Sequence, residues 1–425
     1  MKFFHIADLH LGKMLHNVSL VGTDQAFWVE QFLQAADRFR PDAVVIAGDI
    51  YDRRVPGTDA MKLFDHMLTK LAGRGIYVFV IPGNHDSAVR VSHVNELLES
   101  HHIYIAGEPG KELMHVTVPI LNHAMPEAAL DTSHGVTFWL MPYLFPRAVA
   151  DLGLLDEEAP SSYDEAVRAV LSAQEIDTDT CNVLVAHQNV LAHGMKPEHS
   201  ESETIIGGIG EIDYTAFDAF DYVALGHIHN AQKMGRETVR YSGCPLYYDF
   251  SEMNRSKDLT LVTINSKTDI SIEKVEIPLL HRLIQKSGTL EELLVQGVQL
   301  RDKDKYYIQC ILTGKHVPPR ALEQLREVYG DSLINVKRDT ELSGEQLAEN
   351  ASSGLKGQAA LSLEEQFDAF FHDQMDELLD ECQEALVRKI VEQQSRQGSD
   401  YVQKASDVPE SDSQELIDIL RHGPD

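Results

Sequence analysis

Positive charge is scarce in this 425-residue chain, which has 37 Lys and Arg against 67 Asp and Glu and a formal net charge of −30. A protein whose whole surface coats nucleic acid carries an excess of Lys and Arg, because these residues make the phosphate contacts. The net charge therefore disfavours that class of protein. A local nucleic-acid site is compatible with it, because a bound metal pair can reverse the field of an acidic cluster.

Long apolar runs and closely spaced cysteines are missing as well. No segment approaches the ~20 apolar residues that cross a bilayer, and Asp8 and His10 interrupt the N-terminus before the core of a secretion signal could form. The four cysteines lie too far apart for a zinc site or a redox pair. They are Cys181, Cys244, Cys310 and Cys382. These absences predict a cytoplasmic protein that does not enter a membrane.

Three short apolar segments near the N-terminus each end in polar side chains. The segments 2–7, 43–47 and 76–81 have the β-branched and aromatic composition of buried strands, and helical patterns at about 23–39 and 59–72 separate them. This alternation predicts a β-α-β-α-β unit with a parallel sheet. Ligands collect at the carboxyl ends of such strands, so the turns that follow them are candidate sites.

The predicted elements continue to about residue 277. Two further buried strands, 182–186 and 222–225, end in histidines, and short strands between and after them make part of the sheet antiparallel. Short strands are predicted at 103–106, 115–120 and 136–141, and hairpins at 233–241 and at 259–264 with 270–277. A helix is predicted over 91–98 and a loop over 190–212.

The composition changes after Pro278, which marks a domain boundary. Residues 1–277 form the predicted first domain, and residues 278–342 form a small β-α-β domain with strands at 306–312 and 333–336. Three C-terminal segments follow. They are a polar linker at 343–360, an amphipathic acidic helix at 361–395 and an acidic tail without predicted order at 396–425.

The strand ends carry carboxylates, imidazoles and one amide. They are Asp8, His10, Asp49, Asp52, Asn84, His85, Asp86, His187, His227 and His229. This mixed N/O ligand set suits Mn²⁺, Fe or Zn, and the absence of thiolates disfavours a structural zinc site. Two metals about 3.5 to 4 Å apart that share a carboxylate would use most of these groups and activate water for attack on phosphorus. The alternative for Asp86 is that it caps the helix that follows.

These groups resemble, in order, the motifs of the calcineurin-like metallophosphoesterase superfamily. Its DxH, GD, GNH, H and GHxH blocks correspond to Asp8/His10, Asp49, Asn84/His85, His187 and His227/His229. Within the superfamily, the sequences around residues 3–12 and 81–87, the chain length and the small domain after Pro278 are similar to the SbcD family of bacterial nuclease subunits. The similarity covers residues 1 to about 340.

The resemblance implies a role for each group. Asp8, His10 and His229 would hold one divalent metal, and Asn84, His187 and His227 the other, with Asp49 as the bridge. Mn²⁺ is the expected metal, with Mg²⁺ or Fe as alternatives. His85 would stay off the metals and either protonate the leaving oxygen or stabilise the transition state.

One position departs from the family pattern. Many relatives carry a histidine where this chain has Asp52, and the local sequence instead resembles a block of the protein serine/threonine phosphatases. In that block the aspartate orients the histidine of the GNH motif, so we expect Asp52 to pair with His85. Arg53 and Arg90 are expected to contact the DNA backbone.

The resemblance also implies an architecture and an activity. The architecture is an α/β fold, a four-layer α/β/β/α sandwich with a small α/β capping domain that positions DNA and with C-terminal helices. The activity is ATP-stimulated double-strand exonuclease, single-strand endonuclease and hairpin opening in DNA repair and recombination. The implied assembly is a heterotetramer in which a homodimer of nuclease subunits binds the SbcC ATPase. Its expected location is the cytoplasm, on the nucleoid when it is bound to DNA.

Two further expectations concern the partner. The chain has no GxxxxGK[ST] phosphate-binding loop, so ATP use would belong to SbcC. The helix at 361–395 is expected to bind SbcC, and the alternative is that it packs on its own domain. The other functions considered are a two-metal phosphomonoesterase, a cyclic-nucleotide phosphodiesterase and a non-catalytic scaffold for SbcC.

Overall fold

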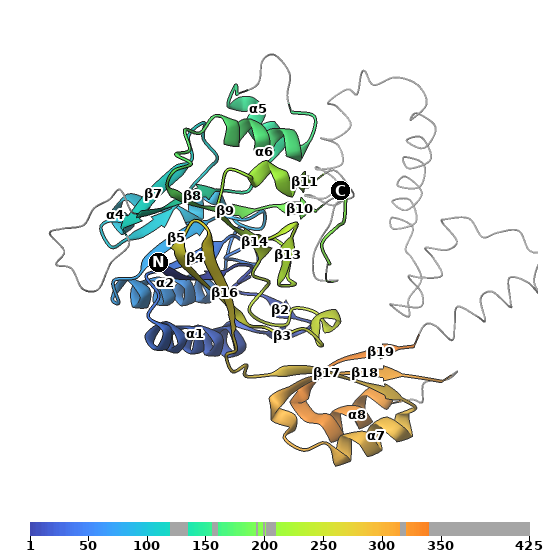
Figure 1. Ribbon diagram of the computed structural model, residues 1–425. Coiled ribbons are helices and arrows are strands. Elements are labelled where there is room, and N and C mark those ends of the chain that lie inside the picture. Colours follow the sequence, from blue (N-terminus) through green and yellow to red (C-terminus); the bar gives the residue numbers. More distant parts are fainter. Residues whose placement is uncertain are drawn as a thin grey trace, which may run out of the picture. The chain divides into compact units, whose positions relative to one another are not determined.

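The computed structural model describes residues 1–119, 135–154, 160–192, 194–198, 200, 210–314 and 320–339. Contacts divide the chain into two units, Met1–Asp339 and Thr340–Asp425. The predicted linker at 343–360, helix at 361–395 and tail at 396–425 therefore lie outside the described residues. Within the first unit, two six-stranded sheets lie face to face and carry helices on their outer sides, which confirms the predicted four-layer α/β/β/α fold (Figure 1).

The first sheet contains the strands that were predicted from the N-terminal sequence. Its order is β16-β15-β1-β4-β5-β6, with β1, β4, β5 and β6 parallel, β15 antiparallel to β1, and β16 antiparallel to β15. The strands are β1 (Lys2–Ile6), β4 (Ala43–Ala47), β5 (Tyr77–Ile81), β6 (Ile103–Ile105), β15 (Leu259–Ser266) and β16 (Asp269–Val275). The parallel strands place the turns after β1, β4 and β5 at one edge of the sheet.

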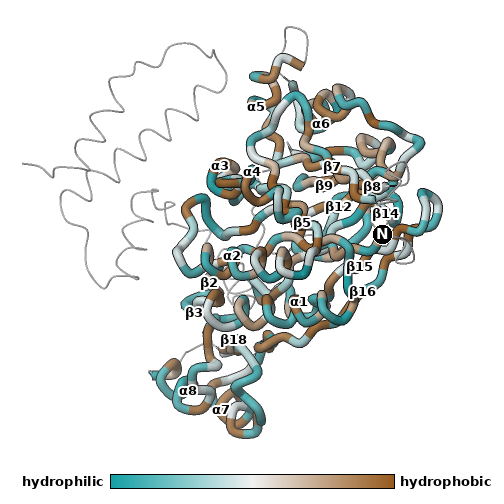
Figure 2. Tube along the Cα trace, turned by 90° about the vertical axis from the view of Figure 1, so that its left-hand side faces the viewer, coloured by the Kyte–Doolittle hydropathy of each residue, from teal (hydrophilic) through white to brown (hydrophobic). Residues whose placement is uncertain are grey.

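Helices α1 (Ala26–Phe39) and α2 (Thr58–Ala72) cover the outer face of this sheet. Both alternate between hydrophobic and hydrophilic residues along the tube in Figure 2, as expected for helices with one buried face. Trp28 and Phe32 of α1 stack with ring centroids 5.3 Å apart in the core beneath them. A single π-helical turn, Val21–Gln25, precedes α1, so the regular helix begins three residues after the predicted start at 23.

The second sheet supplies the remaining strand ends. Its order is β13-β14-β12-β9-β8-β7, and β8, β9, β12 and β14 are parallel. The strands are β7 (Met114–Pro119), β8 (Gly135–Met141), β9 (Cys181–His187), β12 (Tyr222–Gly226), β13 (Gln232–Met234) and β14 (Arg236–Tyr241). Helices α5 (Pro146–Asp151) and α6 (Tyr163–Ser172) pack on its outer side. The predicted loop at 190–212 is partly wrong, because β10 (Asn189–Leu191) pairs with β11 (Glu211–Asp213).

Aromatic side chains fill the space between the two sheets. Phe79 of β5 stacks on Phe138 of β8 with centroids 4.3 Å apart, and Phe3 of β1 meets Phe138 edge-on at 5.4 Å. His5 is buried here, with Nδ1 3.0 Å from the Tyr222 hydroxyl and Nε2 3.1 Å from the Leu225 carbonyl oxygen. Burial lowers the pKa of His5 to about 3, so it serves as a neutral core residue. This packing holds β1 against β12, and both strands lead to candidate ligands.

A separate three-stranded parallel sheet follows residue 281. Its order is β17-β18-β19. The elements are β17 (Arg282–Gly288), α7 (Leu290–Gln299), β18 (Tyr306–Leu312), α8 (Ala321–Tyr329) and β19 (Leu333–Arg338). The sequence predicted β18, α8 and β19 but missed β17 and α7. Residues such as Leu293 and Leu325 give this part a hydrophobic core of its own.

The predicted helix at 91–98 is broken into two short pieces. They are α3 (Ala88–Val91) and α4 (Asn95–Glu99). Val94 between them adopts a left-handed φ of 61°, which a continuous helix does not permit. The Ser92 hydroxyl donates to the Ala88 carbonyl oxygen over 2.9 Å and closes the first piece. The break keeps α3 short beside the turn that carries Asn84 and His85.

Candidate metal centre

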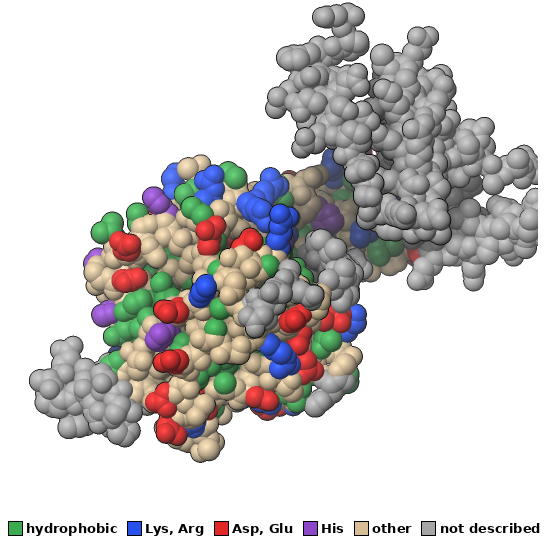
Figure 3. All heavy atoms as spheres, turned by 90° about the horizontal axis from the view of Figure 1, so that it is seen from above, with side chains coloured by type: hydrophobic (Ala, Val, Ile, Leu, Met, Phe, Trp, Pro, Cys, Tyr) green, Lys and Arg blue, Asp and Glu red, His purple; other side chains and the backbone are tan. Residues whose placement is uncertain are grey.

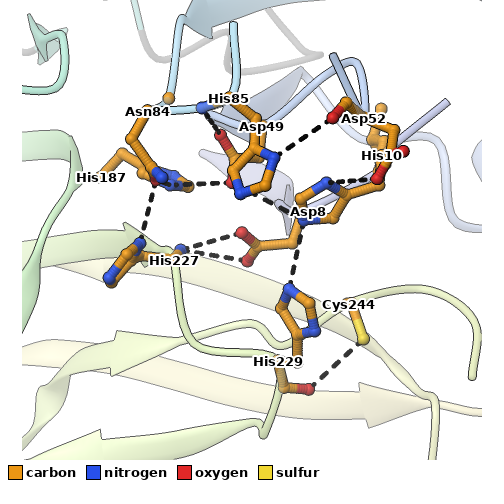
Figure 4. Close-up of polar contacts among 12 residues, drawn as sticks. Asp8, His10, Asp49, Asp52, Asn84, His85, His187, His227, His229 and Cys244 are labelled. Atoms are coloured by element: carbon orange, nitrogen blue, oxygen red, sulfur yellow. Dashed lines mark hydrogen bonds and ion pairs between the residues drawn. The ribbon is translucent and has the colours of Figure 1, made fainter. Parts of the chain in front are cut away.

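The structure brings all seven predicted metal ligands together at the carboxyl ends of five strands (Figure 4). They are Asp8 and His10 after β1, Asp49 after β4, Asn84 after β5, His187 at the end of β9, and His227 and His229 after β12. Three of these strands belong to the first sheet and two to the second. The centre therefore lies where the edges of both sheets meet.

The turns after β1 and β4 have unusual backbone conformations. Asp8, His10 and Asp49 have φ values of 54°, 41° and 50°, in the left-handed region that L-residues rarely adopt. Two backbone hydrogen bonds hold the turns side by side, from Asp8 N to Gly48 O at 3.0 Å and from His10 N to Asp49 O at 2.9 Å. Such strain is tolerated where the surrounding structure imposes it, as at functional sites.

Glycine is required at position 48. Gly48 has a φ of 89°, and a Cβ placed on it would lie 2.3 Å from Nδ1 of His187. The absence of a side chain lets the β4 turn approach the imidazole closely enough for His187 Nδ1 to donate to the Ala47 carbonyl oxygen at 2.7 Å. Because a carbonyl can only accept, this bond directs the other nitrogen, Nε2, toward the centre.

The first group of ligands contains Asp8, His10 and His229, whose ligand atoms lie within 4.8 Å of one another. Nε2 of His10 and Nε2 of His229 face each other at 3.2 Å. Two imidazole nitrogens at this distance share at most one proton, and a cation between their lone pairs satisfies both. Burial lowers the pKa of His10 well below its ordinary value and keeps the ring neutral, as a metal ligand must be.

The second group is organised around one amide oxygen. Oδ1 of Asn84 lies 3.1 Å from Nε2 of His187 and 3.1 Å from Nδ1 of His227. The backbone N–H of His227 also donates to both carboxylate oxygens of Asp8, at 3.0 and 3.1 Å. The second group is thereby connected to the first.

Asp49 lies between the two groups. Its Oδ2 is 3.6 Å from Nε2 of His10 and 3.4 Å from Nε2 of His187, while its Oδ1 accepts the backbone N–H of His85 at 2.9 Å. Burial alone would lower the pKa of His187, but Asp49 outweighs it and raises that pKa to about 9. Burial also raises the pKa of Asp8 to about 6. Two buried carboxylates beside several imidazole nitrogens fit divalent cations, and a bound cation would take the place of the proton that the raised pKa keeps on His187.

A buried ion pair supports His229 from behind. Nδ1 of His229 lies 3.4 Å from Oε1 of Glu252, and Oε2 of Glu252 accepts from Nζ of Lys257 at 2.7 Å. Nζ of Lys257 is also 2.9 Å from Sγ of Cys244. His229, Cys244 and Glu252 could by distance hold a cation of their own, but the Lys257 ammonium already lies among them. No local sequence pattern indicated Glu252 or Lys257, because their partners become neighbours only in the folded chain.

His85 is half-buried and makes a different contact from the expected one. Its Nδ1 lies 3.2 Å from the main-chain carbonyl oxygen of Asp52, not from the carboxylate. The Asp52 carboxylate instead binds Nζ of Lys13 at 2.8 Å and lies 3.8 Å from Nδ1 of His10. The expected pairing through the Asp52 side chain is therefore wrong in this detail, because Lys13, which the sequence did not single out, takes the carboxylate.

Asp86 is structural and does not cap a helix. Its carboxylate accepts the backbone N–H groups of Gly83 at 2.9 Å, Ile50 at 3.0 Å and Tyr51 at 2.9 Å. Ser87 occupies the N-cap position of α3 instead. Asp86 thus ties the turn after β4 to the turn after β5 and holds Asp49 beside Asn84.

The two predicted DNA-contacting arginines lie on the surface near the centre. The side chain of Arg53 is 75% exposed and its Nε is 3.8 Å from Asp52 Oδ2. Arg90 is exposed on α3 and lines a cavity that also contains Asn84. Their positions leave both side chains accessible, and a DNA contact by either stays a prediction.

Comparison with known proteins identifies the family. Residues 1–231 match the family model of the calcineurin-like phosphoesterases. The D subunit of the nuclease SbcCD from Staphylococcus epidermidis is 28% identical over 336 residues, which cover 78% of this chain and 84% of that protein. No helix within the described ranges has the length and apolar character needed to cross a bilayer.

Two solved structures are more distant. A dimetal phosphatase from Danio rerio is 12% identical with a TM-score of 0.37, and the match covers 66% of this chain and 98% of that one. A phosphoesterase, Yfce, from E. coli is 13% identical with a TM-score of 0.26, and the match covers 65% of this chain and 100% of that one. The family match alone extends over more than half of the sequence, so the chain belongs to the calcineurin-like phosphoesterase family.

Proposed function

We propose that this chain is the nuclease subunit of a DNA-processing complex and hydrolyses DNA phosphodiester bonds with two divalent metals. Membership of the phosphoesterase family supports hydrolysis of a phosphoester bond. The observation that carries the two-metal chemistry is the position of Asp49 Oδ2, between His10 at 3.6 Å and His187 at 3.4 Å. DNA as the substrate is supported by the similarity to the D subunit of an SbcCD nuclease over 84% of that protein.

The ligands divide between the two metals as the geometry suggests. Asp8, His10 and His229 would hold one metal and Asn84, His187 and His227 the other, with Asp49 shared. Mn²⁺ suits this set of imidazole, carboxylate and amide donors, and Mg²⁺ or Fe are the alternatives. When bound, such a pair lowers the pKa of water and neutralises the charge that develops on the phosphoryl oxygens.

His85 acts on the substrate in this proposal. The Asp52 carbonyl oxygen accepts from Nδ1 of His85, so the imidazolium form can give its Nε2 proton to the leaving oxygen and stay as the neutral ring with its remaining proton on Nδ1. Asp52 acts through its main chain as a positioning residue, and its carboxylate holds Lys13. Arg53 and Arg90 contact the DNA backbone.

Contacts with DNA are local in this proposal. On the face shown in Figure 3, Lys and Arg side chains are interspersed with Asp and Glu. Attraction of DNA to such a mixed surface depends on the metals and on a few arginines beside them. The small domain after Pro278 helps to position the DNA.

The partner is an SbcC-type ATPase, in a complex with two copies of this chain that form a homodimer. The similarity to the D subunit of an SbcCD nuclease supports that assignment. The domain boundaries proposed are 1–277, 278–342, 343–360, 361–395 and 396–425, and the segment 361–395 docks on SbcC. Nuclease activity in repair and recombination then takes place on the nucleoid in the cytoplasm.

An assay of the purified chain with Mn²⁺ tests this function. Linear duplexes, hairpins and single strands are offered with and without SbcC and ATP, beside p-nitrophenyl phosphate and a cyclic nucleotide. We expect cleavage of DNA, and its loss in His85→Ala and Asp49→Ala. Turnover of the small esters alone would instead identify a phosphomonoesterase or a cyclic-nucleotide phosphodiesterase. If both metals are bound and no substrate is turned over, the result would favour the alternative that the chain is a non-catalytic scaffold for SbcC.

A further inference from the structure

A cavity of about 650 Å³ opens directly beside the second group of ligands. Its floor is the turn after β5, Pro82 to Asn84, so it shares Asn84 with the candidate metal centre. Part of its wall is α3 with Arg90, and another part is the segment that joins β8 to α5 and contains Tyr143 and Phe145. A molecule in the cavity would therefore lie next to whatever the metals hold.

The aromatic wall is held in place. Tyr143 donates its backbone N–H to the Pro82 carbonyl oxygen at 3.2 Å, and its ring centroid lies 6.1 Å from that of His187 and 6.2 Å from that of His227. Leu144 is fully buried in the core under the second sheet. Phe145 follows at the N-cap position of α5, with its ring 4.7 Å from that of Tyr143.

Phe145 nevertheless faces solvent. Its side chain is 42% exposed although it is a large apolar ring on a well-anchored segment. The preceding residue, Leu144, is buried in the hydrophobic core, so this segment can bury an apolar side chain, and Phe145 is exposed by contrast. Val55 and Val89 line the same cavity and are exposed as well, so several apolar side chains face solvent at one cavity beside the candidate metal centre, as in a ligand-binding site.

We propose that this cavity binds an unpaired nucleobase of the strand being cut, in the nucleotide next to the scissile phosphodiester, with Phe145 as the stacking platform. The inference rests on the proposed nuclease function. It adds a binding site for the nucleobase, the part of the substrate that the metals would not contact. Phe145 is then a substrate-binding residue. Tyr143, whose ring lies near both Phe145 and the candidate ligands His187 and His227, positions it.

The lining favours a base over a second phosphate. The lining has two arginines, Arg54 and Arg90, and three carboxyl groups, so it has no excess of positive charge for a phosphate. The carboxyl groups are those of Asp86, Glu108 and Asp151. An aromatic ring and adjacent proline and alanine surfaces suit a flat heterocycle. The volume lies within the range of about 300 to 1,000 Å³ that is usual for small-ligand pockets.

The base must be unpaired to enter. A base within a duplex is stacked on both faces and cannot offer a face to Phe145, so the nucleotide has to leave the stack. Unstacking is easiest at ends, mismatches and single strands. The cavity therefore predicts faster cleavage at linkages whose neighbouring base is already unstacked.

The test uses the full-length chain with Mn²⁺ and single-stranded oligonucleotides that contain one cleavable linkage. One substrate is intact, and two others carry an abasic residue on one side or the other of that linkage. Wild type is compared with Phe145→Ala, with Phe145→Leu, which keeps apolar bulk without an aromatic face, and with Phe145→Tyr, which keeps the face. Bound metal and melting temperature are measured for each variant, so that loss of folding is recognised.

We expect one of the two abasic substrates to lose about 5- to 150-fold in kcat/KM with wild type, the range that corresponds to one base–aromatic stack. Phe145→Ala and Phe145→Leu should show a similar loss on the intact substrate but less than about twofold on that abasic one, because the stack is absent already. Phe145→Tyr should restore the rate on the intact substrate.

Two results overturn the inference in distinguishable ways. Equal losses on intact and abasic substrates, or no loss on either, show that Phe145 does not stack on a base while the nuclease function stands. A wild-type chain that hydrolyses p-nitrophenyl phosphate and cleaves no oligonucleotide overturns the proposed function and the inference together.

Discussion

Nδ1 of His85 lies 3.2 Å from the main-chain carbonyl oxygen of Asp52, while the Asp52 carboxylate binds Lys13 at 2.8 Å. The histidine is thus oriented by a backbone atom that no side-chain substitution removes. The two functions of Asp52 can therefore be separated by mutation.

We predict that Asp52→Asn keeps most of the activity. The carbonyl oxygen remains, and the charge that faces Lys13 and, at 3.8 Å, Nδ1 of His10 is lost, so kcat should fall by less than about 10-fold. His85→Ala should lower kcat by about 10² to 10⁴, because it removes the proton donor itself. Steady-state kinetics on one oligonucleotide measures both variants. A loss in Asp52→Asn as large as that in His85→Ala would show that the carboxylate orients His85 after all.

The second prediction concerns metal content. Asp49 Oδ2 lies between His10 and His187, so Asp49→Ala removes a donor from both groups of ligands at once. We expect this variant to bind fewer than two metals per chain and to lose the rise in melting temperature that Mn²⁺ gives wild type. Elemental analysis and calorimetry with and without a chelator measure these effects. Two tightly bound metals in Asp49→Ala would contradict the bridging position.

The third prediction uses the close approach at Gly48. A Cβ at this position would lie 2.3 Å from Nδ1 of His187, and the φ of 89° is unfavourable for alanine. Gly48→Ala should displace the His187 ring, weaken metal binding and lower the melting temperature. Gly22→Ala is the matched control, because its Cβ would meet nothing within 4 Å. Equal metal binding by both variants would show that the turn after β4 can yield.

The candidate ligands were predictable from the sequence because each follows a short run of buried apolar residues. Asp49 comes two residues after the fully buried strand Ala43–Ala47, and His187 ends the buried strand Cys181–His187. Parallel strands bring such ends to one edge, so spacing along the chain was sufficient to group them. The resemblance to the metallophosphoesterase motifs then implied how the ligands divide between two metals.

Other features depend on contacts that the sequence does not encode locally. Strand β17 was missed because it alternates weakly and only Leu283 of its seven residues is buried. The contact of His85 with a backbone oxygen, in place of a carboxylate, depends on the path of the chain around Asp52. The aromatic wall at Tyr143 and Phe145 belongs to a connecting segment without a motif.

The fourth prediction concerns the pair behind His229. Glu252 and Lys257 are buried and 2.7 Å apart, and Glu252 lies 3.4 Å from Nδ1 of His229. Glu252→Gln should weaken metal binding by about 10- to 100-fold, since it removes the charge that orients the ligand. Lys257→Met alone leaves Glu252 without its ammonium partner and should cost about 3 to 5 kcal/mol of stability. The double variant should be more stable than Lys257→Met, because no uncompensated charge remains. Metal titration and chemical denaturation measure the two effects, and a double variant as unstable as Lys257→Met would contradict the pairing.

The fifth prediction concerns the contact between the turn before α1 and two residues of the later sheet, His281 before β17 and Tyr307 of β18. Asp24, before α1, lies 2.9 Å from Nδ1 of His281 and accepts from the Tyr307 hydroxyl at 2.7 Å. Burial alone would raise the pKa of Asp24, but the hydrogen bonds from His281 and Tyr307 outweigh burial and lower it. A carboxylate whose pKa is lower in the folded state contributes stability at pH values above its unfolded pKa of about 4. This contribution disappears as the pH falls through the folded-state pKa.

Asp24→Asn should therefore melt below wild type at pH 7, and the difference in melting temperature should shrink as the pH falls below about 4. Thermal melts of both proteins across this range measure the effect, with Asp42→Asn as a control for a different carboxylate that binds a backbone N–H at Lys2. A difference that stays constant with pH would show that the Asp24 charge does not stabilise the contact.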